Sequence, residues 1–172
     1  MFKLLITLFV SLFVTSVIAQ EKSDGDYIRL VAELDEPEYY CFDLAGWGEK
    51  LRLDDPLQTH TCKLRGGADQ MFKFEEGQLT VVGFDRCVEV TGSQPNSLPG
   101  SAVLARECNA DNPLQKLNLN ANGQVQLSDT PYCITAGADS KEAGGPSHMW
   151  RTLTLANCDS AGAELSSWQL GL

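Results

Sequence analysis

Three short stretches of the same pattern decide the fold: Cys41-Phe42-Asp43-Leu44, Cys87-Val88-Glu89-Val90 and Cys133-Ile134-Thr135-Ala136. Their cysteines follow one another at intervals of 46 residues. A second cysteine follows the first within each unit by 21, 21 and 25 residues, at Cys62, Cys108 and Cys158. These spacings predict a threefold repeat whose third unit has a four-residue insertion between Gly137 and Arg151.

The six cysteines of this 172-residue chain permit 15 disulfide pairings. Because equivalent cysteines of a threefold structure should have equivalent partners, the repeat favours Cys41–Cys62, Cys87–Cys108 and Cys133–Cys158. Pairing between units remains open but breaks the symmetry. Zinc is disfavoured, since the chain has no Cys-x-x-Cys pair and its only histidines are His60 and His148. We expect neither a metal nor another cofactor.

Apolar residues alternate with polar ones in short runs, as in strands that are buried on one face. Residues 72–74 and 79–81 predict one hairpin around Gly77, and residues 117–119 and 125–127 predict another around Gly123. Further alternating runs precede each second cysteine, and no stretch after residue 19 has a convincing helical period. We therefore predict an all-β fold of three units with about four strands each.

The first 19 residues are nearly uninterrupted apolar sequence. Their apolar run, residues 4–18, follows Lys3 and is shorter than the roughly 20 residues that span a bilayer. We expect residues 1–19 to be a secretory signal peptide. Residues 20–172 then form a single extracellular domain, with repeats at about 27–76, 77–122 and 123–172, because no second domain has room.

The chain is acidic, with 13 Lys+Arg against 23 Asp+Glu and a formal net charge of −10. The expected leader holds one Lys and no acid, so the remainder carries a charge of −11. Such a surface repels nucleic acid and anionic lipid. We expect neither nucleic-acid binding nor stable membrane insertion, while 43% hydrophobic residues suffice for a core.

Together these features resemble the ricin-type β-trefoil lectins, or ricin B-like domains similar to carbohydrate-binding module family 13. The resemblance covers essentially the whole chain after the leader. The Gln-x-Trp motif of that family corresponds here to Gln70-Met71-Phe72, Gln115-Lys116-Leu117 and Ser166-Ser167-Trp168. The resemblance implies a β-trefoil fold in which Phe72, Leu117 and Trp168 pack in a shared core.

The resemblance also implies a sugar site in the first repeat. Asp43 occupies the position that accepts hydrogen bonds from sugar hydroxyls, and Gln70 matches the glutamine of the motif. His60 stands where Trp or Tyr is more usual, and Asp69 replaces the usual Asn. Trp47, in the loop after Asp43, is a candidate for the missing aromatic surface, or it packs against its own loop.

The other two repeats match that site poorly. The second has substitutions at three of four positions and keeps only Gln115; we expect it to be silent, given Glu89, Arg106 and Leu114. The third loses every expected polar contact, with Thr135, Ala156, Leu165 and Ser166. Its insertion holds His148-Met149-Trp150, which forms either a separate contact surface for a glycan or protein or a cap on the core.

Two functions follow from these patterns. The first is a secreted lectin that binds glycans or glycoconjugates through one pocket in the first repeat. The alternative is a sugar-silent β-trefoil that acts as a protein-binding or inhibitory secreted factor. An enzyme is the least favoured, because the two histidines lie in different units and neither belongs to a nucleophile or metal motif.

Overall fold

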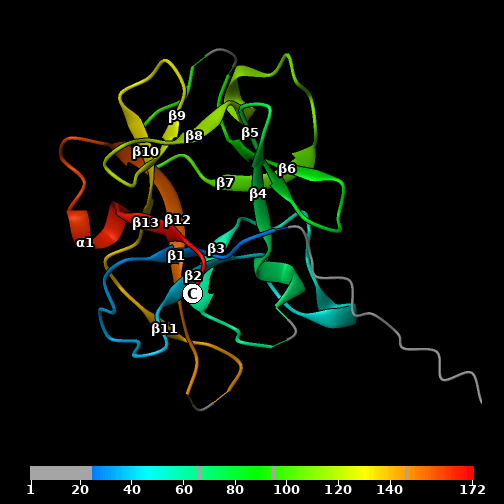
Figure 1. The fold of residues 1–172 in the computed structure, drawn as a ribbon, viewed down its shortest axis with the longest axis vertical. Coiled ribbons are helices and arrows are strands. Elements are labelled where there is room, and N and C mark those ends of the chain that lie inside the picture. The colour runs from blue at the N-terminus through cyan, green and yellow to red at the C-terminus, as the bar shows by residue number, and fades with distance from the viewer. Residues whose placement is uncertain (1–24, 66, 94–95, 146) are drawn as a thin grey trace, which may run out of the picture.

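The computed structural model describes residues 25–65, 67–93, 96–145 and 147–172. The expected leader, residues 1–19, lies outside these ranges. Strands and loops dominate the described chain (Figure 1), and its helical segments are four short ones: α1 (Ala163–Ser166) and the 3-10 helices η1 (Gly48–Lys50), η2 (Ala68–Gln70) and η3 (Pro113–Gln115). Within those ranges, no helix is long and apolar enough to cross a membrane.

Each repeat contributes four strands in the same order. The first repeat holds β1 (Ile28–Leu30), β2 (Tyr40–Asp43), β3 (Gln58–Thr61) and β4 (Phe72–Glu75). The second holds β5 (Gln78–Val81), β6 (Arg86–Val90), β7 (Val103–Glu107) and β8 (Leu117–Leu119). The third holds β9 (Val125–Leu127), β10 (Tyr132–Ala136), β12 (Met149–Asn157) and β13 (Trp168–Leu170). The short strand β11 (Lys141–Glu142) is additional and lies in the predicted insertion.

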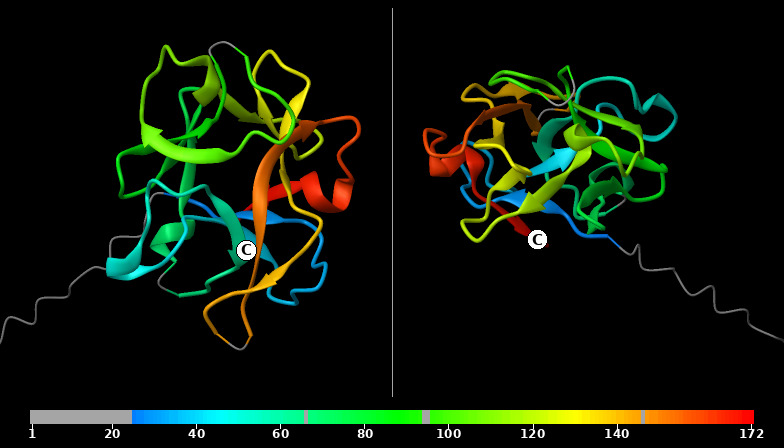
Figure 2. Two further views of the ribbon diagram at one scale, coloured as in Figure 1. Left: turned by 180° about the vertical axis from the view of Figure 1, so that it is seen from behind. Right: turned by 90° about the horizontal axis from the view of Figure 1, so that it is seen from above.

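The strands form two sheets that close on one another. The larger has the order β13-β1-β2-β3-β12-β10-β9-β8, with β11 beside β12, and the smaller has the order β4-β5-β6-β7. Isolated bridges join the two sheets at Asp26–Phe72, Gln78–Lys116 and Ala102–Thr154. Strand β1 pairs with β13, with Leu30 opposite Trp168, so the first and last strands lie side by side (Figure 2).

The hairpins predicted around the glycines are present. Strands β4 and β5 pair from Phe72–Val81 to Glu75–Gln78. The two residues between them, Glu76 and Gly77, both have positive φ, at 51° and 75°. A two-residue turn with this conformation matches the right-handed twist of its strands, and glycine adopts it without steric cost.

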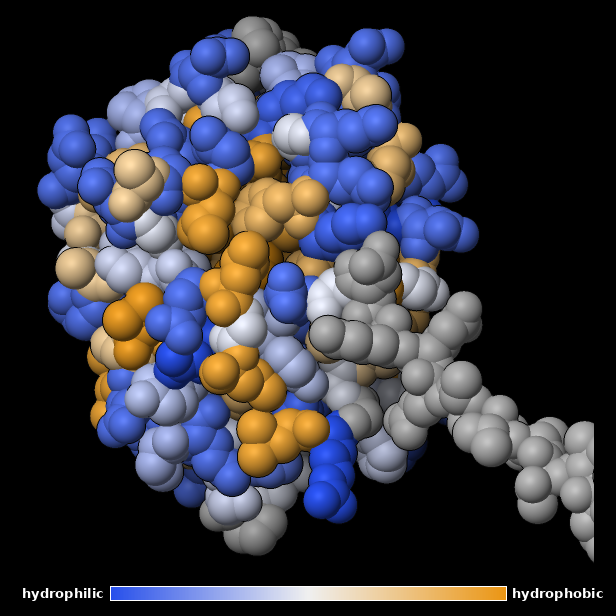
Figure 3. All heavy atoms as spheres, viewed as in Figure 1, coloured by the Kyte–Doolittle hydropathy of each residue, from blue (hydrophilic) through white to orange (hydrophobic). Residues whose placement is uncertain are grey.

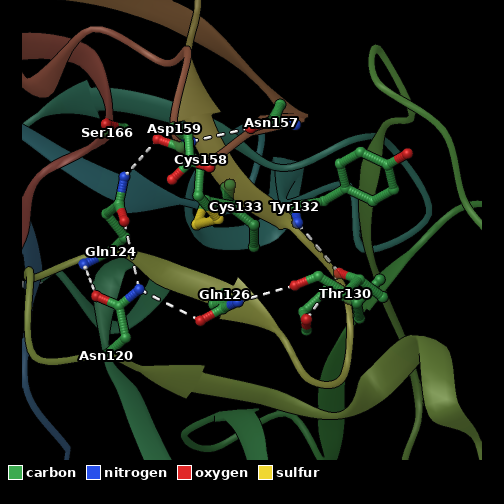
Figure 4. Close-up of a disulfide and its surroundings, with 12 residues drawn as sticks. Asn120, Gln124, Gln126, Thr130, Tyr132, Cys133, Asn157, Cys158, Asp159 and Ser166 are labelled. Atoms are coloured by element: carbon green, nitrogen blue, oxygen red, sulfur yellow. Dashed lines mark hydrogen bonds between the residues drawn. A yellow bond between two sulfur atoms is a disulfide. The ribbon is translucent and has the colours of Figure 1, made fainter.

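The three disulfides are Cys41–Cys62, Cys87–Cys108 and Cys133–Cys158, as the repeat predicted. Each joins the second strand of a repeat to the residue that directly follows the third strand. Around the disulfide of the third repeat, amide side chains form a network (Figure 4). Asn120 donates to Gln124 and Gln126, and Gln124 donates to the Cys158 carbonyl. This network fixes the β8–β9 turn against the disulfide.

The core lies between the sheets and draws on all three repeats. Phe42 meets the Phe72 ring edge-on at 5.8 Å and the Trp168 ring at 4.6 Å between centroids. Phe72, Leu117 and Trp168 are all buried, which confirms the expectation for the three motif ends. The face shown in Figure 3 is mostly hydrophilic, with an interrupted row of apolar side chains across it.

Candidate functional site

The predicted acceptor, Asp43, ends strand β2 with its side chain inside the protein. It is 0% exposed, and both carboxylate oxygens accept hydrogen bonds from neighbouring side chains. Gln58 Nε2 donates to Oδ1 at 3.0 Å, and Gln70 Nε2 donates to Oδ2 at 2.9 Å. Lys63 Nζ forms an ion pair with Oδ2 at 2.8 Å. Three side-chain donors therefore already satisfy this carboxylate.

Lys63 brings together the two acids predicted for the site. Its ammonium also donates to Asp69, which η2 holds beside Asp43, so two carboxylates share one cation. Burial raises the pKa of Asp43, and the Lys63 ammonium opposes that shift. Burial acts to lower the pKa of Lys63, but attraction to Asp43 and hydrogen bonds to both acids raise it overall. Lys63 is therefore charged at neutral pH.

Gln70 fixes the loop that carries Lys63. Its Oε1 accepts from the Lys63 backbone N–H at 2.8 Å, and its Nε2 also donates to the Thr61 carbonyl at 3.1 Å. The backbone N–H of Leu44 reaches across to the Asp69 carbonyl at 2.9 Å. The loop from β3 to η2 is therefore fastened to β2 by side chains and by backbone.

A cavity of about 1250 Å³ opens on the solvent side of this cluster. Three of the five predicted residues line it: Trp47, His60 and Asp69. Trp47 is 73% exposed and stands at the start of η1, so it does not pack into the core. Asp43 and Gln70 are buried behind the cavity wall, where Lys63 separates Asp43 from the opening.

Two residues of the cluster were missed from the sequence. Gln58 precedes His60 by two positions on β3 and therefore shares its face, which is a signal that strand alternation offers. Lys63 directly follows Cys62, but nothing in the sequence indicates that its side chain turns back onto Asp43. Both Gln58 and Lys63 line the cavity as well.

The sequence model of the ricin-type beta-trefoil lectin domain matches residues 33–161, which is most of the chain. The chain belongs to the ricin-type β-trefoil lectin family. Membership assigns this lectin domain to a family of carbohydrate-binding domains. A search of curated protein sequences finds no match.

Three solved structures of low sequence identity have the same fold. The mdaA-1 domain shares 14% identity at a TM-score of 0.61, covering 88% of this chain and 91% of that chain. The Vibrio vulnificus hemolysin/cytolysin β-trefoil lectin, solved with N-acetyl-D-lactosamine bound, shares 17% sequence identity at a TM-score of 0.56. The match covers 86% of this chain and 93% of that chain. Cytolethal distending toxin from Actinobacillus actinomycetemcomitans shares 16% sequence identity at a TM-score of 0.58. The match covers 88% of this chain and 93% of that chain.

The second repeat of the lectin domain has a similar cluster around Glu89, at a smaller cavity of about 550 Å³. Gln115 Nε2 and Asn112 Nδ2 each donate to Glu89 Oε2 at 2.8 Å. The sequence comparison put Leu114 at the amide position, yet Asn112, which caps η3, supplies the amide. Arg106 faces this cavity in the position that His60 has in the first repeat.

Among the residues of the third repeat that the structure describes, there is no comparable cluster. Thr135 and Ser166 hydrogen-bond to backbone carbonyls of Cys133 and Gly162 instead. Its insertion, however, reaches the first repeat, where His148 and Trp150 line the large cavity. Within the described ranges, no group of three or more His, Cys, Asp or Glu side chains is arranged to hold a metal ion.

Proposed function

We propose that this lectin domain is secreted and binds glycans in the cavity of the first repeat. One observation carries the proposal: the cavity joins the polar groups of Asp69 and Lys63 to the exposed ring of Trp47. A sugar presents hydroxyls on its edges and a C–H surface on its face. It therefore needs hydrogen-bonding groups beside an aromatic ring, which this cavity supplies.

The five predicted residues take different parts in this proposal. Trp47 and His60 offer ring surface to the sugar, and Asp69 accepts from a hydroxyl. Lys63 has three ammonium hydrogens and donates two of them to Asp43 and Asp69, which leaves one for the ligand. Asp43 and Gln70 act from behind the wall by holding Lys63 and its loop in place.

Two further observations support the proposal. The β-trefoil lectin of Vibrio vulnificus, with the same fold, was solved with N-acetyl-D-lactosamine bound, which favours a glycan as the ligand class. Three disulfides are typical of proteins in an oxidising compartment, which favours secretion and an extracellular location.

A glycan array tests this function. Wild-type protein should bind at least one glycan class, and Trp47→Ala should abolish or strongly reduce the signal, because the ring is solvent-exposed and its loss leaves the core intact. Leu98→Ala is the matched control: Leu98 is 69% exposed and does not line this cavity, so binding should not change. Wild-type protein that binds no glycan would refute the proposal.

A second candidate function is protein binding without sugar recognition. The observation that favours it is the state of Asp43, whose carboxylate is 0% exposed and accepts from three internal donors. An acceptor used in this way serves the fold without any ligand. Capture of a defined extracellular protein by wild type and Trp47→Ala alike, with an empty glycan array, would select this function.

A further inference from the structure

The insertion in the third repeat lengthens strand β12 beyond its counterparts. β12 has nine residues, whereas β3 and β7 have four and five. Its second half, Leu153–Asn157, pairs with β10 as the equivalent strands do in the other repeats. Its first half pairs with β3, with Trp150 opposite His60 and Thr152 opposite Gln58. The extension therefore joins the third repeat to the first.

This pairing turns side chains of both repeats toward the same cavity. Residues directly opposite one another in an antiparallel pair share a face of the sheet. His60 and Gln58 line the cavity, and so do their partners Trp150 and Thr152. The alternate residues, Thr59 and Arg151, are buried on the other face. The cavity therefore extends from the first repeat, across the pairing of β3 with β12, onto the third repeat.

The pairing of β3 with β12 is fixed by polar contacts of buried and partly exposed side chains. The Met149 backbone N–H donates to Thr61 Oγ1 at 2.9 Å, and this hydroxyl donates to Glu36 at 2.6 Å. Arg151 forms an ion pair with Asp35 at 2.5 Å. Side chains on a strand held in this way need little ordering when a ligand binds.

Trp150 and His148 form the aromatic part of the added wall. Lys141, on the neighbouring strand β11, places its ammonium 5.1 Å from the centroid of the Trp150 ring, within the range of a cation–π contact. The His148 ring meets the His60 ring edge-on at 5.4 Å. The rings of His60 and Trp47, from the first repeat, line the same cavity.

The size of the cavity exceeds what one sugar ring fills. Sites that enclose drug-sized ligands have volumes of about 300–1,000 Å³, and this cavity has about 1250 Å³. We propose that the extension of the third repeat forms a second sugar subsite around Trp150, so that the site binds an oligosaccharide of two or more rings. This inference rests on the proposed glycan-binding function and assigns the ligand class of the same cavity.

The two subsites have separate tasks. One ring of the oligosaccharide lies at Trp47, Lys63 and Asp69, and the next lies against Trp150 with Thr152 and Glu142 as hydrogen-bonding groups. Because the second ring adds contacts without a second loss of translational freedom, affinity rises with chain length. It stops rising when the chain outgrows the cavity.

Calorimetric titration with sugar ladders tests this division. The probes form ladders that each begin with one ring: galactose and N-acetyl-D-glucosamine followed by N-acetyl-D-lactosamine and its linear oligomers, and chito- and xylo-oligosaccharides of one to six rings. Trp150→Ala should weaken binding of probes with two or more rings about tenfold, which is the upper end of the affinity that one aromatic contact contributes. It should leave the affinity for the single-ring probe of the same ladder, which reaches only the first subsite, within about twofold of wild type. His148 precedes β12, so His148→Ala removes another ring of the second subsite without changing the strand, and it should likewise weaken the longer probes selectively.

Indole N–H signals in NMR spectra give an independent readout. The chain has three tryptophans, and Trp168 is buried with its Nε1 donating to the Ile134 carbonyl at 3.0 Å. A single-ring probe should shift the Trp47 signal alone, and a longer probe should shift Trp47 and Trp150. The Trp168 signal serves as an internal control and should not move.

The outcomes separate this inference from the function beneath it. If no ladder binds wild type, the glycan function fails and the second subsite fails with it. If a ladder binds but its affinity is independent of length, or Trp150→Ala weakens every member equally, the cavity has one subsite and only the present inference is overturned. If Trp150→Ala folds and its affinity for every probe is unchanged, the second subsite is likewise overturned while the glycan-binding function stands.

Discussion

Lys63 and Asp43 form an ion pair of 2.8 Å in which the carboxylate is completely buried. Lys63 comes from the loop after β3, while Asp43 ends β2, so the pair ties two neighbouring segments of the first repeat. Breaking such a pair by removing one partner leaves an uncompensated charge in the interior, which is costly.

Lys63→Met should therefore destabilise the protein. Loss of one partner from a buried pair costs about 3–5 kcal/mol. Because the Lys63 side chain retains some exposure, we expect the free energy of unfolding to fall by about 2 kcal/mol. Urea unfolding, monitored by tryptophan fluorescence, measures this free energy in wild type and variant. Adding Asp43→Asn to Lys63→Met should recover part of the loss, and a single variant as stable as wild type would contradict the prediction.

Asp35 predicts a dependence of stability on acid pH. Burial acts to raise the pKa of this carboxyl, but hydrogen bonds from Ser140, Arg151 and Tyr40 outweigh it and hold the pKa below its ordinary value. A lowered folded-state pKa gives stability that is complete above the unfolded value of about 3.9. That stability is lost as pH falls through the folded value.

Between pH 5 and 2, wild type should consequently lose more stability than Asp35→Asn. Thermal unfolding at half-unit intervals of pH provides the comparison. Asp159→Asn, at an exposed position in the turn after β12, is the control and should follow the wild-type curve. Parallel curves for wild type and Asp35→Asn would rule out this role for Asp35.

Removing the disulfide of the third repeat should cost roughly 3 kcal/mol, the value for closing a loop of about this length in the chain-entropy model. The cysteines lie 25 residues apart, compared with 21 in the other two repeats. A Cys133→Ser and Cys158→Ser double variant, unfolded in guanidinium without reductant, gives the measurement. A loss below 1 kcal/mol would show that the amide network around this disulfide holds the turn unaided.

Phe42→Ala should be the most damaging of these changes. Phe42 packs edge-on against both Phe72 and Trp168, so truncation opens a cavity where the repeats meet. A buried Phe→Ala substitution costs about 3–5 kcal/mol. Leu98→Ala, on the exposed surface, should change stability by less than about 0.5 kcal/mol under the same urea titration. Equal effects of the two variants would disprove a shared aromatic core.

The repeat made most of the fold predictable from sequence. The interval between cysteines favoured the observed disulfides and three units of about four strands each, because equivalent residues occupy equivalent places in a threefold structure. The family resemblance added the three core positions. Phe72, Leu117 and Trp168 differ in size, yet each ends the same motif and each is buried. A period of this kind carries long-range information that single strands lack.

The site was less predictable, because it depends on where loops place side chains. Asp43 and Gln70 follow the family pattern, but the partner between Asp43 and the cavity is Lys63, which strand periodicity does not position. In the second repeat Leu114 occupies the family's amide position, so no amide was expected there, yet Asn112, two residues earlier, supplies one. The pairing of β12 with β3 joins two repeats, and a cysteine period, which relates equivalent positions within repeats, does not indicate such a contact.

The pairing of β1 with β13 also constrains how the protein is made. Ile28 lies opposite Leu170, so β1 lacks this neighbour until the chain has been synthesised as far as β13. Until then its outer edge presents unpaired N–H and C=O groups to any other extended chain. A chain that still lacks β13 is thus an intermediate with an open sheet edge, and emergence of β13 becomes the condition for solubility as well as for shape.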